Sequence, residues 1–350
     1  MNYFDRFAIE LKTENRAIYL YGAGFIADKI VSLLKERNID IDGYVVDERF
    51  LPKEKKCCQK DGKSIFTINE IDRDCVLVDA IQLNECQVVL PSNDFVKKVY
   101  RLDFSSYVLH GAYDEDFVME NIPAFAKLYD RLGDIESKIS MANFIVQKVT
   151  GMYSKPKTQR IQYFDEDIFL PQENETFVDC GAYDGDSLLG FIDFLKKHNV
   201  SSYRKCFAFE PDEENYNKLV KNVSNFPDIK AFKIGTYCRK ASLCFSDGKD
   251  TGSSIQSCGK TTIEVDTIDN IVNGEEVTYI KMDIEGAELD SLKGAKKTIL
   301  KHRPKLAVCV YHKMDDLLTI ANYLLSLHND YKLYLRNYKM AGVETVLYAI

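Results

Sequence analysis

Two kinds of hydrophobic pattern alternate along this chain. Short apolar runs bounded by polar loops occur at 177–180, 206–210, 230–234, 279–284 and 306–311. Such runs are typical of buried parallel strands. Between them, apolar residues recur every three or four positions, as in the segment 188–195, which predicts amphipathic helices. The alternation indicates an α/β fold with a mostly parallel sheet from about residue 156 onward.

The last two predicted strands differ from the others in their connection. They cover 332–335 and 345–349 and are joined by only the short segment 336–344. A terminal hairpin, added antiparallel to the parallel sheet, fits this spacing. An insertion between the third and fourth strands contains two segments of period two, 241–245 and 262–266, which predict additional strands.

The first part of the chain repeats the strand–turn–helix pattern on a smaller scale. An apolar run reaches the glycine turn Gly22-Ala23-Gly24, and the segment 25–36 has one apolar helical face. Further strands are predicted at 41–47, 75–81 and 86–91, and the Lys-rich segment 52–63 is predicted to be a surface loop. We therefore expect a second, smaller Rossmann-like α/β domain.

A helical segment separates the two α/β regions. Apolar residues recur three or four apart from Ile122 to Val149, with Asn121 as the predicted cap, Gly133 as a break and Gly151 as the end. The predicted domains are a small Rossmann-like domain at 1–112, a helical bridge at 113–155 and a larger domain at 156–350. The apolar face of the bridge leaves room for a homo-oligomer contact.

The charge and composition of the chain bear on its binding partners and on its compartment. The 350 residues carry a net charge of −8, which gives no general electrostatic reason to bind nucleic acid or an anionic membrane. The first ten residues lack the apolar core of a signal peptide, and no apolar run approaches the ~20 residues of a membrane span. Ten scattered cysteines without a Cys-x-x-Cys pair suggest reduced, buried thiols, and we expect a cytoplasmic protein.

One motif carries the strongest chemical signal. In the segment 176–187 a strand ends at Asp179, the backbone turns on Gly181 and Gly185, and an apolar helical pattern follows. Sheets hold nucleotide-like cofactors at such turns. The alternative is a turn required by packing alone. The predicted cofactor contacts in this turn are Asp179, Cys180, Gly181, Ala182, Gly185 and Asp186.

An acidic residue ends the next predicted strand. Glu210, followed by Pro211, can accept hydrogen bonds from both ribose hydroxyls through its two carboxylate oxygens. A surface acid at a strand end is the alternative. The turn and this acid together favour cofactor binding.

Three carboxylates surround the end of a further strand. Asp283 and Glu285 alternate onto one side of an extended segment, and Glu288 falls in the following helix. Helix N-terminal acids that complement the helix dipole are the alternative explanation. The order of glycine turn, Glu210 and this trio favours an S-adenosylmethionine-dependent methyltransferase over a dehydrogenase. The pair Asp283 and Glu285 could also hold a divalent ion such as magnesium, although no metal ligand is assigned.

A histidine ends the fifth predicted strand at the same edge. Removal of a hydroxyl proton suits a histidine of near-neutral pKa, so His312 is a candidate base beside Asp283 and Glu285. A lone histidine is more often structural.

From residue 162 to the end, the chain resembles the FkbM family of S-adenosylmethionine-dependent methyltransferases. The resemblance rests on the segments 178–186, 209–211, 280–288, 292–294, 311–312 and 344–349, of which Lys-x-Asp-x-Glu-Gly-Ala-Glu at 281–288 is the most specific. It implies a Rossmann-like methyltransferase sheet and O-methylation, often of a sugar. Asp179, Gly181 and Glu210 would contact the cofactor, while Asp283, Glu285 and His312 would lie at the transfer site.

The smaller domain resembles Rossmann-like domains that accompany bacterial sugar-modifying enzymes. Gly22, Gly24 and Asp47 form a second candidate nucleotide site, because Asp47 lies near the spacing of a ribose-binding acid. A degenerate scaffold is the alternative. Two other functions stay open: a nicotinamide-dependent oxidoreductase or epimerase, and a non-catalytic assembly protein. The expected partner is a small-molecule or glycan acceptor.

Overall fold

The computed structural model describes residues 1–51, 59–81, 92–153, 160–246, 254–255, 261–339 and 342–350. By their internal contacts these residues form two compact units. The first comprises Met1–Ile122, Ala142–Pro156 and Lys339–Val343, and the second comprises Pro123–Met141, Lys157–Tyr338 and Glu344–Ile350.

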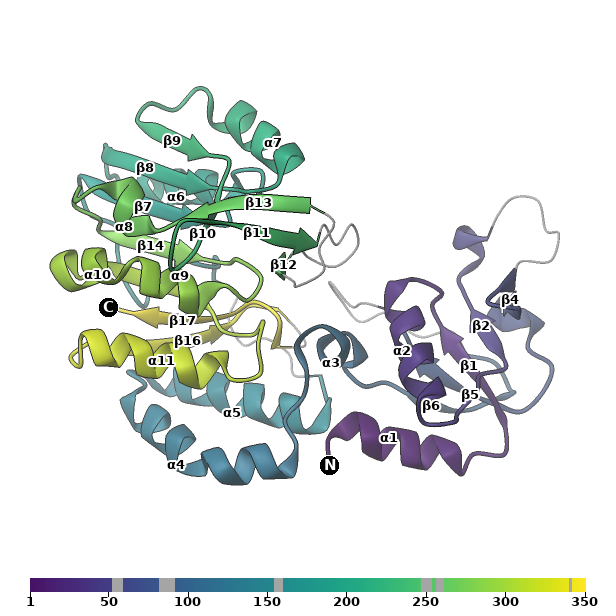
Figure 1. The fold of residues 1–350 in the computed structure, drawn as a ribbon. Coiled ribbons are helices and arrows are strands. Elements are labelled where there is room, and N and C mark those ends of the chain that lie inside the picture. The colour runs from purple at the N-terminus through teal and green to yellow at the C-terminus, as the bar shows by residue number, and fades with distance from the viewer. Residues whose placement is uncertain (52–58, 82–91, 154–159, 247–253, 256–260, 340–341) are drawn as a thin grey trace. The chain divides into compact units, whose positions relative to one another are not determined.

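A mostly parallel sheet forms the centre of the first unit (Figure 1), in the order β3-β4-β2-β1-β5-β6. Only the β3–β4 pair is antiparallel. The strands are β1 (Ala17–Tyr21), β2 (Gly43–Val45), β3 (Gln59–Lys60), β4 (Lys63–Phe66), β5 (Cys75–Asp79) and β6 (Val96–Tyr100). The hairpin β3–β4 replaces part of the loop predicted at 52–63, because Gly62 adopts φ +75° and permits a tight turn. The strand predicted at 86–91 lies outside the described residues.

Three helices pack against one face of this sheet: α1 (Tyr3–Lys12), α2 (Phe25–Lys35) and α3 (Phe104–His110). Their apolar residues share a core with alternate residues of β1 and β5, as period-two strands require. Two short 3₁₀ helices follow β2 and β4, at Glu48–Phe50 and Ile68–Glu70. The sequence analysis missed α1, whose start is capped by Asn2 Oδ1 accepting from Asp5 N at 2.9 Å.

The predicted helical segment is a pair of helices, α4 (Glu115–Arg131) and α5 (Ile135–Thr150), interrupted around Gly133. Its predicted start at Asn121 is wrong. Asp114 Oδ1 accepts from Phe117 N at 2.8 Å and begins α4 earlier, which leaves Pro123 inside the helix. The boundary between the two units falls inside both helices, so each contributes residues to both.

A seven-stranded sheet forms the centre of the second unit, in the order β16-β17-β15-β14-β7-β8-β9. Its strands are β7 (Glu175–Cys180), β8 (Tyr203–Phe209), β9 (Ile229–Phe232), β14 (Tyr279–Met282), β15 (Lys305–Cys309), β16 (Leu333–Asn337) and β17 (Thr345–Ala349). Strands β7, β8, β9, β14 and β15 are parallel, and β17 is antiparallel to both β15 and β16. This confirms the predicted Rossmann-like sheet with a terminal antiparallel hairpin.

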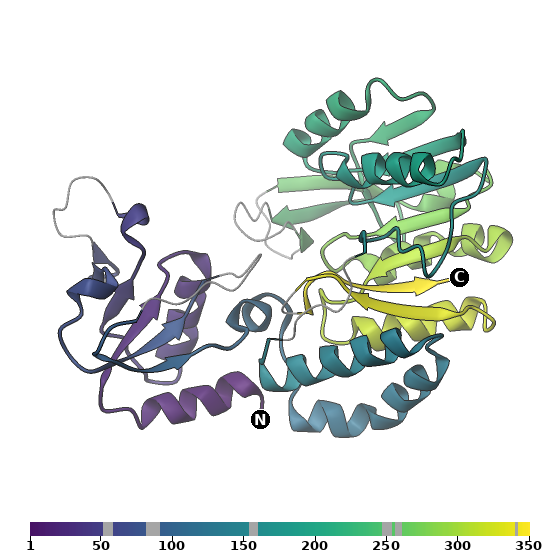
Figure 2. The same cartoon turned by 180° about the vertical axis from the view of Figure 1, so that it is seen from behind.

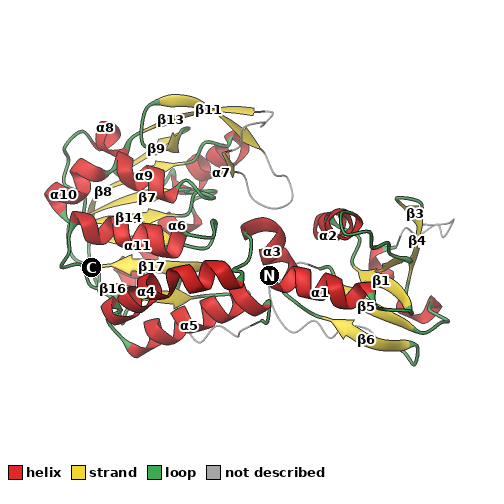
Figure 3. Cartoon of the chain, turned by 60° about the horizontal axis from the view of Figure 1, so that its bottom comes forward, coloured by secondary structure: helices red, strands yellow, loops and turns green. Residues whose placement is uncertain are grey.

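Helices cover both faces of the seven-stranded sheet (Figure 2). On one face lie α6 (Asp186–Lys197) and α7 (Glu213–Val223), and on the other α9 (Glu288–Gly294), α10 (Lys296–His302) and α11 (Asp316–Leu327), with α8 (Ile268–Val272) beside α9 and α10. The predicted insertion forms a separate four-stranded sheet from β10 (Gly235–Thr236), β11 (Ala241–Ser246), β12 (Ser254–Ile255) and β13 (Thr261–Asp266). All four strands are labelled in Figure 1, and β11 and β13 also in Figure 3.

Cys75, Cys180, Cys206 and Cys309 are free and buried in strands, as predicted for the cysteines of the strands. In the described part of the chain, no helix combines the length and the apolar character needed to cross a membrane.

The carboxyl ends of β14, β7 and β8 lie next to one another, because β7 pairs with both neighbours. The chain reverses its direction of winding at β7, so this edge is the place where doubly wound sheets bind ligands. Gly181 comes directly after β7, and a Cβ there would lie 1.9 Å from the backbone oxygen of Asp283. Its φ of +78° also favours glycine.

We expect Gly181→Ala to lower the free energy of unfolding by at least about 3 kcal/mol, because overpacking against rigid backbone adds to left-handed strain. Gly274→Ala is the matched control, since Gly274 has φ +79° but nothing within 4 Å of its Cβ position. That control should lose about 1–2 kcal/mol in chemical denaturation. Equal losses in both variants would contradict the close approach.

Candidate functional site

The glycine turn after β7 is tied to the end of β8. The backbone N–H groups of Gly181 and Ala182 each donate to Phe209 O at 3.0 Å. Tyr183 adopts φ +46° and Gly185 φ +95°, and Gly185 then precedes the first residue of α6. The turn thus presents the N-terminus of α6 at the carboxyl edge of the sheet, the edge at which such sheets bind ligands.

Glu210 lies beside this turn, as the sequence predicts. Its Oε2 accepts from Tyr183 N and its Oε1 from Asp212 N, both at 2.9 Å. Burial raises the pKa of the Glu210 carboxyl to about 7. Each carboxylate oxygen can accept a further hydrogen bond, so the group is able to receive two hydroxyls. Pro211 ends the extended segment, and Asp212 caps α7.

Three other predicted cofactor contacts are engaged within the protein. Asp179 is fully buried, and its Oδ2 accepts from Ser187 Oγ at 2.5 Å. Burial raises the pKa of the Cys180 thiol to about 12, which keeps it protonated and unreactive. Asp186 Oδ1 accepts from Ser187 N at 2.7 Å in the first turn of α6. Asp179 and Cys180 support the turn from the interior, while Asp186 is exposed at the start of α6.

Sequence reasoning missed Lys281, a residue of β14 that the structure makes central. Its Nζ lies 3.0 Å from Asp179 Oδ1 and donates to Gly181 O at 2.6 Å, with the side chain 3 % exposed. Burial lowers the pKa of this ammonium, but Asp179 and Asp283 raise it more, so the group stays charged. Lys281 lies two residues before Asp283, so strand alternation puts both side chains on the same face. Its place at the site could therefore have been inferred from the sequence.

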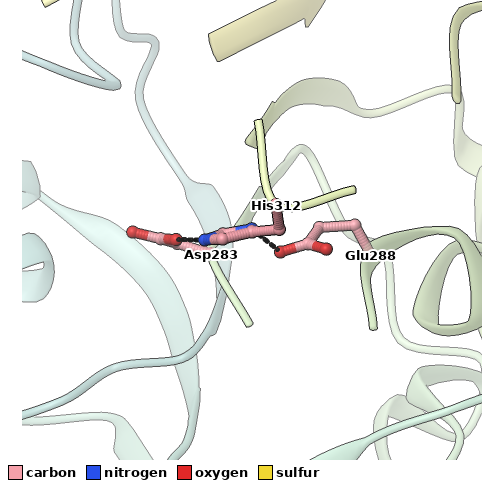
Figure 4. A group of neighbouring side chains, drawn as sticks. All are labelled: Asp283, Glu288 and His312. Carbon is pink, nitrogen blue, oxygen red and sulfur yellow. Dashed lines mark ion pairs between the residues drawn. The ribbon is translucent and has the colours of Figure 1, made fainter. Parts of the chain in front are cut away.

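Asp283 and Glu285 lie together with His312, as the sequence predicts, and Figure 4 shows Asp283 beside the imidazole. His312 Nε2 is 3.5 Å from Asp283 Oδ1 and 3.5 Å from Glu285 Oε2. Tyr163, a further residue that the sequence analysis did not assign, donates its hydroxyl to Asp283 Oδ2 at 2.8 Å. Glu285 has φ +55°, so the chain turns here instead of continuing as an extended strand.

Glu288 holds the other side of the imidazole. Its Oε1 lies 2.8 Å from His312 Nδ1 and accepts from Ile284 N at 2.9 Å. The Glu288 side chain is fully buried. This pair orients the ring so that Nε2 faces Asp283 and Glu285.

The carboxylates around His312 argue against the expectation that its imidazole is the base. Burial lowers the pKa of His312, but Glu288, Asp283 and Glu285 raise it more, to about 10. The imidazole is therefore charged at neutral pH and holds no free lone pair for a hydroxyl proton. Burial raises the pKa of Glu285 to about 7, and its side chain is 38 % exposed. Glu285 is the accessible group whose pKa suits proton abstraction.

A divalent ion fits this arrangement poorly. Ligand atoms of Asp283, Glu288 and His312 lie within 4.8 Å of one another, but the imidazole ring lies between the two carboxylates (Figure 4). The three groups thus point at each other instead of at a common centre. In a second group, with Asp283 and Glu344, burial raises the pKa of the Cys309 thiol well above its usual range, which disfavours the thiolate that a metal requires.

The second candidate nucleotide site belongs to the first unit. Gly22 and Gly24 lie in the turn between β1 and α2, and Asp47 follows β2, which neighbours β1. The structure therefore brings these three residues to one edge of the six-stranded sheet.

Comparison with known proteins gives a clear result for the second unit. Residues 179–338 match the model of the methyltransferase FkbM domain. The crystal structure of Methyltransferase FkbM from Methylobacillus flagellatus KT aligns with a TM-score of 0.73 and 24% identity, over 99% of this chain and 93% of that chain. No curated protein matches the chain.

Two other solved structures align less well. An rRNA methylase from Streptococcus thermophilus has a TM-score of 0.31 and 14% identity, over 51% of this chain and 87% of its own. Aeropyrum pernix fibrillarin, solved with natively bound S-adenosyl-L-methionine, has a TM-score of 0.32 and 10% identity, over 52% and 70%.

We expect the His312 imidazole to remain protonated through pH 8 in NMR titrations, with its signal assigned by loss in His312→Gln. Glu288→Gln should lower the titration midpoint, because Glu288 is the largest source of the raised pKa of His312. Asp290→Asn, a change in the same helix α9, should leave the midpoint in place. A His312 midpoint near 6.5 in the unchanged protein would contradict the described charge balance.

Proposed function

Because residues 179–338 match the model of the methyltransferase FkbM domain, we propose that this chain is an S-adenosylmethionine-dependent O-methyltransferase that acts on a hydroxyl of a sugar or glycan-related acceptor. One observation carries the proposal. The glycine turn and the acid cluster meet in direct backbone contact, since Gly181 lies against the carbonyl of Asp283. A cofactor held by the turn would therefore have its reactive end beside Asp283 and Glu285.

The residues around Glu210 fit a ribose. The carboxylate is buried and fixed by two backbone donors, and it keeps lone pairs for two hydroxyls. Its raised pKa means that burial disfavours the charged form, and donors on a bound ribose would offset that cost. Asp179, Cys180, Gly181, Ala182, Gly185, Asp186 and Pro211 would shape the rest of the pocket, with Asp283 at its far end.

S-adenosylmethionine supplies an electrophilic methyl group on a sulfonium. The chain's own residues would orient the acceptor and take its proton. Glu285 would take the proton of the acceptor hydroxyl as its oxygen is methylated. Asp283, held by Tyr163 and His312, would fix the acceptor by hydrogen bonding. His312 would keep these acids in place as a cation instead of acting as the base.

The acid-rich edge supports a hydroxyl acceptor. Methylation of an alcohol requires removal of a proton that is held tightly, so a carboxylate of raised pKa near the reacting oxygen assists the transfer. Sugars offer several hydroxyls that paired carboxylates can recognise through bidentate hydrogen bonds. We assign the sugar on the family resemblance and on this chemistry together.

Glu210→Gln tests the cofactor site. Loss of the charged acceptor for two ribose hydroxyls should weaken S-adenosylmethionine binding by roughly 1.5–3 kcal/mol, or about 10- to 150-fold, in isothermal calorimetry. Glu214→Gln, at an exposed position of α7, should bind as the unchanged protein does. Equal affinity in Glu210→Gln and the unchanged protein would remove Glu210 from the site.

Glu285→Gln tests the base. With a panel of nucleotide sugars and methyl glycosides as acceptors, release of S-adenosylhomocysteine should rise with pH through about 7 in the unchanged protein, because only the ionised carboxylate takes a proton. The variant should lose about 10²–10⁴-fold in kcat and this pH dependence, while its affinity for S-adenosylmethionine stays the same. An unchanged pH profile in Glu285→Gln would assign the base elsewhere.

A further inference from the structure

The first unit has its own ligand-binding edge. Strand β1 lies between β2 and β5, and the chain builds β2 and β4 on one side of it before it returns to build β5 and β6 on the other. This reversal is the topological switch point at which parallel sheets leave a crevice beyond their carboxyl ends. The turn from Gly22 to Gly24 lies at this point.

Gly22 is required by the protein itself. It adopts φ +113°, and a Cβ there would lie 3.1 Å from Ala80 O and 2.9 Å from Ile81 Cγ2. Its N–H donates to Val45 O at 2.9 Å. The turn is therefore fixed against both neighbouring strand ends, and no side chain fits between them.

Gly24 has no such reason to be glycine. Its φ of −90° and ψ of −165° are extended values that other residues adopt readily, and no described atom lies within 4 Å of its Cβ position. It precedes the first residue of α2 without a side-chain cap, where Ser, Asp or Asn would stabilise the helix. A bare Cα in open space before free N–H groups lets a ligand approach the backbone closely.

Polar groups surround this turn at three adjacent strand ends. Asp47, after β2, is 43 % exposed and pairs with Arg49 at 3.2 Å. Asp79, the last residue of β5, has a fully buried side chain whose Oδ2 lies 3.3 Å from Arg101 Nε. Tyr21, the last residue of β1, pairs with Val45 of β2 and with Asp79 of β5, and burial, Asp47 and Asp79 raise the pKa of its hydroxyl.

A cation contacts the turn itself. Lys60 Nζ lies 2.5 Å from Asp28 Oδ1 in the first turn of α2 and donates to Ala23 O. The side chain is 24 % exposed, so it can reach an anion placed before the helix. An acid after β2 and a cation at the turn match a ligand that carries both ribose hydroxyls and phosphates.

We propose that the first unit binds a nucleoside diphosphate, with the ribose hydroxyls on Asp47 and the diphosphate at the turn Gly22–Gly24 beside Lys60. This activity is separate from methyl transfer. Nicotinamide dinucleotides and nucleotide sugars share the ribose and diphosphate that this edge would recognise. A carboxylate at Asp47 repels a 2′-phosphate, so ligands with a free 2′-hydroxyl are favoured.

Calorimetry on the full chain with ADP, UDP, NADH and NADPH tests the proposal. At least one of ADP, UDP and NADH should bind, and NADPH should bind at least tenfold more weakly than NADH. If NADH binds, the ligand is of the dinucleotide type; if only UDP binds, nucleotide sugars are the natural source. No binding by any probe, or equal binding of NADH and NADPH, would overturn the proposal.

Two variants locate the site. Gly24→Val should lower the melting temperature by only a few degrees, since its side chain enters open space and only the N-cap preference for glycine is lost, but should weaken nucleotide binding at least tenfold. Asp47→Asn should do the same, while Asp40→Asn, at an exposed acid paired with Lys63, should not. Nucleotide binding that survives both Gly24→Val and Asp47→Asn would refute this site. Glu210→Gln should affect S-adenosylmethionine alone, so the two sites fail or succeed independently.

Discussion

The candidate methyl-transfer site depends on one buried ion pair, between Lys281 of β14 and Asp179 of β7. The two residues are opposite each other in adjacent parallel strands, and their charged atoms lie 3.0 Å apart. Lys281 also binds the carbonyl of Gly181, so the same ammonium fixes the turn. Loss of one partner from such a buried pair typically costs about 3–5 kcal/mol, because the other charge is left without compensation.

The acids of the second unit can gather at one edge because buried cations balance them. Lys281 lies near Asp283 and helps to balance its negative charge. The charged His312 lies between Asp283 and Glu288. The balance is incomplete, since Glu285 keeps a raised pKa. An uncompensated carboxyl at a sheet edge is typical of sites where proton transfer occurs.

Hydrophobic periodicity was enough to predict the parallel sheet, the terminal hairpin and the helix pair, because burial of apolar residues determines these elements. It could not give the start of α4, which was predicted at Asn121, since that start depends on the local hydrogen bond of Asp114. The neighbourhood of Asp283, Glu285 and His312 followed from their positions at strand ends. The charge of His312 did not, because it depends on Glu288 Oε1 lying 2.8 Å from the ring, a distance that spacing in the sequence does not give.

The two compact units share helices, and this limits how the protein can be dissected. Arg336 is 1 % exposed and binds Asp134 at 2.7 Å and Asp165 at 3.0 Å. A fragment that began at residue 156, the expected domain boundary, would retain Arg336 and Asp165 but lack Asp134. Its guanidinium would lose hydrogen bonds inside the core, so such a truncation would report on a damaged fold instead of an isolated catalytic module.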